Sequence, residues 1–166
     1  MIARLDLRAR IGLVFALAAL VIGAALASEI FAGLTPCALC LKQRVPYYLA
    51  LPLLGLAYFY APFGKLASRG LLVTVGVVFL SGAGLGVYHA GIEYGFWAGP
   101  ATCGGGGAMA SSPQALLLAL ESQSLVRCDA PAWSLFGISL AGYNALASLG
   151  LAAIAFGTLR HEEDKT

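Results

Sequence analysis

Four long apolar stretches separated by short polar segments dominate the chain. They cover residues 11–34, 45–63, 71–88 and 133–159, and Glu29 is the one charged residue inside them. A helix rises ~1.5 Å per residue, so stretches of this length match a hydrocarbon core of ~30 Å. The pattern predicts an all-α integral membrane protein: a four-transmembrane-helix bundle forming a single membrane domain over residues 1–166, with outer loops at 35–44 and 89–132.

Composition supports this class. Hydrophobic residues make up 60% of the 166 residues and charged residues 11%, and the mean hydropathy is +0.84. A soluble domain of this size could not bury so much apolar surface. The net charge is only +2 and the basic residues are scattered, so a lipid bilayer is the expected partner and nucleic acid is not.

The positions of Lys and Arg predict the orientation, because basic flanks stay on the cytoplasmic side. Seven of them fall on the side of the termini: Arg4, Arg8, Arg10, Lys65, Arg69, Arg160 and Lys165. Three fall on the other side: Lys42, Arg44 and Arg127. Both termini are therefore expected inside. Residues 1–28 also resemble a signal peptide, but the apolar run continues past Ala27, which favours an uncleaved first span.

Three glycines in the third stretch, Gly82, Gly84 and Gly86, have the spacing of a dinucleotide fingerprint. That fingerprint needs a preceding strand inside a βαβ unit, which an apolar membrane span does not provide. Gly82 and Gly86 instead have the small-xxx-small spacing that lets two helices approach closely.

All four cysteines fall in the two predicted outer loops: Cys37 and Cys40 in the first, Cys103 and Cys128 in the second. Two structural disulfides are one interpretation, because such a compartment permits them. A four-cysteine zinc site is less favoured, because only the first pair has close ligand spacing, and no metal is expected.

The first pair has the features of a redox-active site. Thr35 and Pro36 precede Cys37 and are typical of an N-cap and a first helical residue, which predicts both thiols in the first turn of a helix. The positive end of the helix dipole lowers the pKa of a thiol there. Arg44 shares this helical face at ~100° per residue. It serves either as an interfacial anchor or as a cation for a thiolate or an electron acceptor.

The second pair lies in a different setting. Cys103 precedes four glycines, residues 104–107, which suits either a shuttling sulfur or a simple flexible turn. Residues 115–120 form an apolar stretch too short to span a bilayer, and we expect a short interfacial helix there.

Thiol oxidation releases electrons, and the chain has no dinucleotide fingerprint, P-loop or haem attachment motif to receive them. A membrane quinone needs only an interfacial cleft with a few polar groups. The candidates are Arg44, Gln43, His89 and Glu93. An exposed interfacial residue is the simpler interpretation of Gln43. A solvated helix end is the simpler interpretation of His89 and Glu93, although the two could face each other if the helix extends that far.

These features together resemble the bacterial DsbB family of quinone-dependent thiol oxidoreductases. The resemblance rests on four spans, Cys37-x-x-Cys40 followed by Gln43 and Arg44, a second outer cysteine pair, and the segment from Cys128 to Trp133. It implies a location in the bacterial inner membrane with the cysteines on the periplasmic side.

The family also implies a two-disulfide relay. A reduced periplasmic thiol oxidase of the DsbA type would attack the Cys103–Cys128 disulfide, with Cys103 as the site of the mixed disulfide. The disulfide Cys37–Cys40 would then reoxidise that pair, Cys40 would react with ubiquinone or menaquinone, and Arg44 would support quinone binding. Two rival functions are a membrane scaffold with structural disulfides and an enzyme that sends electrons outward. The second would need a cytoplasmic electron input, and no cysteine lies on that side.

Overall fold

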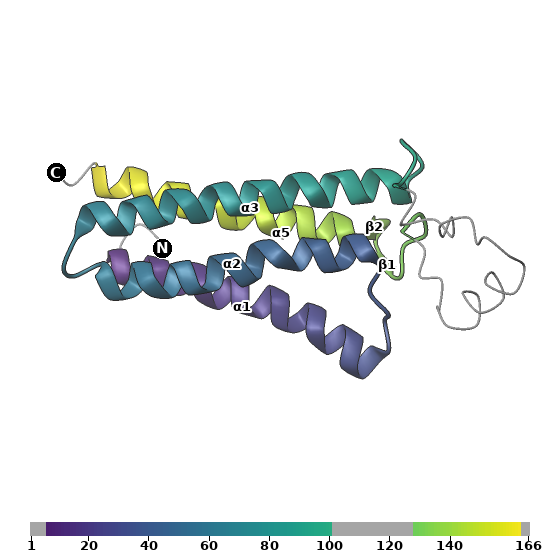
Figure 1. Cartoon of the computed structure of the whole chain (residues 1–166), viewed down its shortest axis with the longest axis horizontal. Coiled ribbons are helices and arrows are strands. Elements are labelled where there is room, and N and C mark those ends of the chain that lie inside the picture. Colours follow the sequence, from purple (N-terminus) through teal and green to yellow (C-terminus); the bar gives the residue numbers. More distant parts are fainter. Residues whose placement is uncertain (1–5, 101–127, 164–166) are drawn as a thin grey trace, which may run out of the picture.

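Four α-helices form an elongated bundle in the computed structural model, which describes residues 6–100 and 128–163. The helices are α1 (Leu7–Ala32), α2 (Ala38–Tyr60), α3 (Lys65–Glu93) and α5 (Leu140–Glu163). Figure 1 shows that the starts of α2 and α5 and the ends of α1 and α3 gather at one end of the bundle, opposite both termini. Cys103 and the apolar stretch 115–120 lie outside the described residues.

Three of the described helices are long and apolar enough to cross a membrane: α1, α3 from Leu66, and α5 up to Leu159. The predicted second span corresponds to α2, which does not reach that hydropathy. Lys42, Gln43 and Arg44 near its start, together with two prolines and four tyrosines, lower its mean hydropathy. Pro46 and Pro52 both lie inside an otherwise continuous helix.

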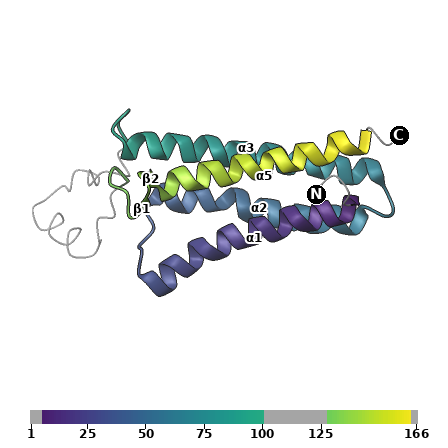
Figure 2. The same cartoon turned by 180° about the vertical axis from the view of Figure 1, so that it is seen from behind.

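The core lies along the shared axis of the bundle. It includes Ile11 from α1, Leu54 from α2, Phe79 from α3 and Ala155 from α5, all with no exposed surface. Towards its C-terminal end α1 leans away from the other three helices, as the two opposite views show (Figures 1 and 2). The four helices therefore lie closest together near the termini.

The small residues of α3 allow close helix packing, as predicted. A Cβ atom at Gly86 would lie 2.9 Å from the backbone nitrogen of Ala145 in α5, and one at Gly82 would lie 3.1 Å from the ring of Pro46 in α2. Neither position has room for a larger side chain without a shift of a neighbour. Gly84 faces open space, because a Cβ atom there would meet nothing within 4 Å.

Two predicted boundaries differ from the structure. The fourth apolar stretch does not form one helix from Trp133, because residues 134–139 form a hairpin of β1 (Ser134–Leu135) and β2 (Ile138–Ser139). Phe136 and Gly137 both have positive φ and make its turn. The Ser139 hydroxyl then accepts the N–H of Gly142, and α5 begins at Leu140. Hydropathy alone does not distinguish an apolar hairpin from a helix start.

The start of α2 also differs from the prediction. Thr35 is not the N-cap; Cys37 is, with extended backbone angles and its sulfur accepting the N–H of Cys40. A cysteine sulfur thus takes the place of the expected hydroxyl, and the helix begins two residues later than a Thr35 cap would place it. Farther along the chain, α3 continues through Glu93, which places His89 and Glu93 on the same helix.

Candidate active site

Cys37 and Cys40 are free thiols at the N-terminus of α2. Their sulfurs lie 3.0 Å apart, and the backbone N–H of Cys40 donates to the Cys37 sulfur at 3.2 Å. Cys37 is buried, with 4% of its surface exposed, and Cys40 is half-buried. The two thiols are therefore in direct contact, and Cys37 is the more buried of the two.

This arrangement separates the acidities of the two thiols. The hydrogen bond from the Cys40 thiol lowers the pKa of Cys37 to about 4, and His89 and the Cys40 backbone N–H act in the same direction against burial. The pKa of Cys40 is raised, first by that same hydrogen bond and then by burial. At neutral pH the shared proton stays on Cys40, and Cys37 is the thiolate.

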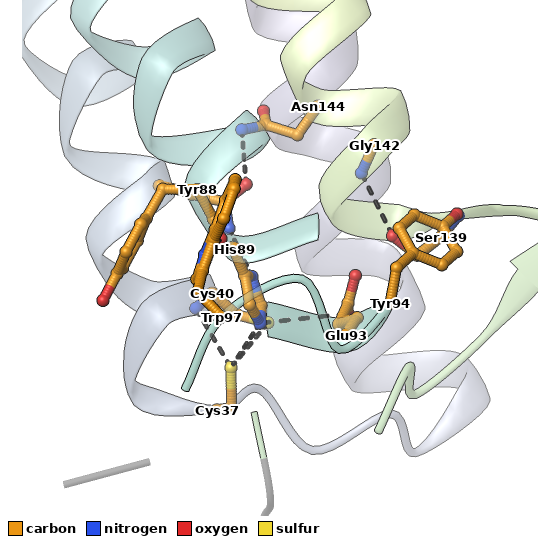
Figure 3. A network of polar contacts seen from close by, with 11 residues as sticks. Cys37, Cys40, Tyr88, His89, Glu93, Tyr94, Trp97, Ser139, Gly142 and Asn144 are labelled. Atoms are coloured by element: carbon orange, nitrogen blue, oxygen red, sulfur yellow. Dashed lines mark hydrogen bonds and ion pairs between the residues drawn. The ribbon is translucent and has the colours of Figure 1, made fainter. Parts of the chain in front are cut away.

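His89 lies next to Cys37, and Glu93 lies beside His89, where α3 ends (Figure 3). The Nε2 atom of His89 is 3.6 Å from the Cys37 sulfur and 3.8 Å from Oε1 of Glu93. Their side chains are only 1% and 5% exposed. The interpretation of these two residues as a solvated helix end is therefore wrong, because the longer α3 carries them into the interior.

Cys128 approaches the same group from the segment before the hairpin. The Cys37 sulfur, a ring nitrogen of His89 and the Cys128 sulfur all lie within 4.8 Å of one another, and all three residues are buried. Cys128 is disulfide-bonded. Because one of the three candidate ligand atoms is already bonded to sulfur, the cluster suits thiol–disulfide exchange better than metal binding.

Gln43 joins this site to a polar row inside the bundle. Its Nε2 lies 2.6 Å from Nδ1 of His89, and its Oε1 accepts from Asn144 at 2.7 Å. Tyr47 continues the row, donating to Asn144 at 2.8 Å and lying 2.9 Å from the Ser148 hydroxyl. Gln43 is 5% exposed, so the expectation of an exposed interfacial glutamine is wrong.

Asn144 and Tyr47 were not among the residues predicted for the site. A signal was present, because Asn144 and Ser148 are polar residues four apart in an otherwise apolar stretch. Polar side chains inside membrane helices usually face the bundle interior and serve a function. Their connection to Gln43 depends on the packing of α2 against α5, which the sequence does not give.

A cavity of about 400 Å³ lies on the other side of the thiol pair. Its walls come from α1, α2 and α5, and they are mainly apolar side chains such as Ile22, Leu140 and Ala147. Its polar groups are few, and the lining residues that carry them include Cys40, Gln43, Arg44, Tyr47 and Asn144. Of the four predicted acceptor residues, Arg44 and Gln43 therefore line the cavity, whereas His89 and Glu93 do not.

Arg44 reaches this cavity while paired with α1. One of its N–H groups donates to Oε2 of Glu29 at 2.7 Å, and its side chain is 12% exposed. A guanidinium has five N–H donors, so this ion pair fixes the group and leaves it able to donate into the cavity. The sequence predicted Arg44 on the same face of the helix as the two sulfurs. In agreement with this, Arg44 and Cys40 line the same cavity.

Comparison with known proteins agrees with this geometry. Residues 7–158 match the family model of disulfide bond formation protein DsbB. The chain belongs to the DsbB family. It is therefore a membrane oxidoreductase of disulfide bond formation, and the resemblance drawn from the sequence is confirmed.

A curated relative of this DsbB-family chain is an uncharacterized protein, RP370, of Rickettsia prowazekii (strain Madrid E). The two are 30% identical over 122 residues, which cover 70% of this chain and 67% of the relative. No solved structure matches the chain.

Proposed function

We propose that this protein reoxidises a periplasmic thiol oxidase of the DsbA type by a two-disulfide relay and passes the electrons to ubiquinone or menaquinone. The observation that carries the proposal is the position of the first thiol pair. Cys37 lies beside Cys128, whereas Cys40 lines the apolar cavity. The pair therefore connects a disulfide on one side to an acceptor site on the other.

The burial of Cys128 supports a defined order of exchange. Only 1% of its surface is exposed, so the active-site thiolate of a folded partner cannot reach it. Attack is expected at Cys103, forming the mixed disulfide there and releasing Cys128 as the thiolate. A second thiolate of the partner then releases Cys103, leaving the partner oxidised and the pair reduced.

The first pair then reoxidises the second. With Cys37 and Cys40 in a disulfide, the Cys128 thiolate attacks the Cys37 sulfur and Cys40 leaves. The Cys103 thiolate next attacks Cys128, which re-forms the Cys103–Cys128 bond and releases Cys37. A low pKa makes a sulfur a good leaving group, and the pKa of Cys37 is about 4. Two electrons now reside on the thiols of Cys37 and Cys40.

The cavity fits a quinone headgroup in size and chemistry, because small-ligand sites are mostly apolar with a few placed polar groups. Cys40 would face the ring, and Arg44, Gln43 and Asn144 would orient its oxygens. A bound quinone accepts two electrons and two protons. The pair supplies both electrons and the proton held on Cys40, and water supplies the second proton. The guanidinium of Arg44 would stabilise negative charge that develops beside Cys40.

The same proposal sets the membrane topology. We place α2 across the bilayer as the fourth span, with the cysteine end of the bundle on the periplasmic side of the inner membrane. The basic residues Arg8, Arg10 and Arg69 lie towards the opposite end, near the termini. Positively charged flanks stay in the cytoplasm, which supports this orientation.

The test is anaerobic quinone reduction by the purified full-length protein, supplied with a reduced DsbA-type protein and followed by quinone absorbance. We expect turnover with the wild type, and its loss in Cys40→Ser and in Cys37→Ser. Ser81→Ala is the control, because this exposed hydroxyl of α3 donates to the backbone carbonyl of Val78 in its own helix. Folded wild-type protein that reduces neither quinone would contradict the proposal and favour a disulfide-stapled scaffold.

A further inference from the structure

A continuous row of hydrogen bonds runs from α5 to the ring of His89. Tyr47 donates to Oδ1 of Asn144, and Nδ2 of Asn144 donates to Oε1 of Gln43. Nε2 of Gln43 then lies 2.6 Å from Nδ1 of His89. Tyr47, Gln43 and His89 are each 5% exposed or less. Asn144 is half-buried beside the cavity, and the other three side chains are nearly enclosed, so the polar groups of the row satisfy one another.

The chemistry at the far side of the ring determines the direction of every amide in this row. Nε2 of His89 faces the Cys37 sulfur at 3.6 Å and the Glu93 carboxylate at 3.8 Å, and the ring also has a hydrogen bond with the backbone of Cys128. That nitrogen therefore carries a proton, and Nδ1, which faces the Gln43 amide nitrogen, accepts through its lone pair. Gln43 must then turn its N–H towards Nδ1 and its oxygen towards Asn144.

We infer that Asn144 and Tyr47 are positioning residues for the redox centre, holding the His89 ring through the Gln43 amide so that its Nε2–H faces Cys37. Both act at a distance from the sulfurs, since their hydrogen bonds go to Gln43, to Ser148 and to each other. The inference deepens the proposed function, on which its catalytic meaning rests, but the position of the ring proton can be tested without quinone or partner.

The orientation matters because the two forms of the ring have opposite effects on the thiolate. A Nε2–H group donates to the Cys37 sulfur, whereas a Nε2 lone pair would repel its negative charge. The other titratable groups around this sulfur are Cys40 from α2 and Glu93 from α3, and Cys128 is held in a disulfide. A reversed amide row would thus make Cys37 a poorer leaving group.

Two substitutions act on the row in different ways. Asn144→Asp places an acceptor-only group at this position, so Gln43 would donate to it and turn its own oxygen towards Nδ1 of His89. The ring proton should then move to Nδ1. Tyr47→Phe removes the donor that orients Asn144, and both forms of the ring should be populated. Thr158→Val is the matched control on α5, because that buried hydroxyl donates to Ile154 in the same helix.

The direct measurement is nitrogen-15 NMR of the side chains in histidine-labelled full-length protein, with the first pair reduced and quinone absent. The chain contains two histidines, so His161→Gln leaves His89 as the only labelled ring. We expect the Nε2–H form in this background and with Thr158→Val, and the Nδ1–H form with Asn144→Asp. A ring that carries a proton on Nδ1 in the starting protein, whether neutral or cationic, would overturn the inference, even if no further variant folded.

The pH profile of Cys37 alkylation is the second measurement, read by mass spectrometry of the peptide that carries it. Losing a hydrogen bond to a charged group should move the midpoint upward by roughly one pH unit in Asn144→Asp. A smaller upward shift is expected in Tyr47→Phe, and none in Thr158→Val. Unchanged midpoints with an unchanged ring form would contradict the inference. A shifted midpoint in a protein that reduces no quinone would instead contradict the proposed function alone.

Discussion

At the scale of single residues, Cys37 links the parts of the site. Its sulfur contacts Cys40 and His89 and lies within 4.8 Å of the Cys128 sulfur. The sequence was enough to single out the first pair, because Thr35 and Pro36 indicate a helix start, where the helix dipole lowers the pKa of a thiol. It was not enough for His89 and Glu93, because their burial depends on how far α3 extends and on what packs over its end.

The acidity of Cys37 gives a prediction at this scale. Its pKa is lowered to about 4, chiefly by the hydrogen bond from Cys40. The thiolate is the nucleophile, so the alkylation rate of Cys37 should stay constant from neutral pH down to about pH 5 and fall through about pH 4. An ordinary thiol would already lose reactivity below about pH 8.5.

Cys40→Ala supplies the control for this profile. Without the neighbouring thiol the main cause of the shift is gone, so the midpoint should rise well above that of the wild type. A wild-type midpoint near that of an ordinary thiol would show that the hydrogen bond does not hold the charge on Cys37. Peptide mass spectrometry after timed alkylation at each pH provides the rates.

At the scale of elements, hydropathy located the four helices but not their ends. The start of α2 depends on a sulfur cap, and the start of α5 on the Phe136–Gly137 turn. Tyr94 reinforces that turn, since its hydroxyl donates to the Gly137 carbonyl and accepts the N–H of Ser139. These are contacts between side chains and backbone from distant parts of the chain, which an average of hydropathy over a window does not detect.

The packing of α3 on α5 gives a prediction at this scale. Gly86→Ala should lower the free energy of unfolding by about 1–3 kcal/mol, as overpacking does, because the new Cβ would meet the Ala145 backbone. Gly84→Ala is the matched control, since that position faces open space in the same helix. It should be neutral or gain up to ~1 kcal/mol of helix propensity. Thermal unfolding in detergent measures both, and equal midpoints would contradict the close contact.

At the scale of the whole molecule, the bundle places all chemistry at one end. The free thiol pair, the buried Cys128 and the cavity lie there, and the termini lie at the other end (Figure 2). The class of fold could be predicted because a bilayer forces apolar residues into long uninterrupted runs. The cavity could not, since its walls come from α1, α2 and α5 and depend on how these helices pack together.

Sidedness is the prediction at this scale. In a full-length variant with all four cysteines changed to serine, Thr35→Cys and Phe63→Cys mark the two ends of the bundle, and both positions are exposed. A membrane-impermeant maleimide applied to cells with a permeable outer membrane should label the cysteine at 35. The cysteine at 63 should react only after the inner membrane is opened. The reverse pattern would contradict the proposed orientation.

The divergence of α1 has a kinetic consequence. The cavity is walled by α1 and α5 as well as α2, so a substrate reaching it between helices would arrive by lateral diffusion in lipid. The concentration that governs turnover would then be the mole fraction of quinone among the lipids, and the bulk molarity would not matter. Fusing quinone-free lipid vesicles with the proteoliposomes dilutes the quinone in the membrane without changing its total amount. This dilution should slow the enzyme.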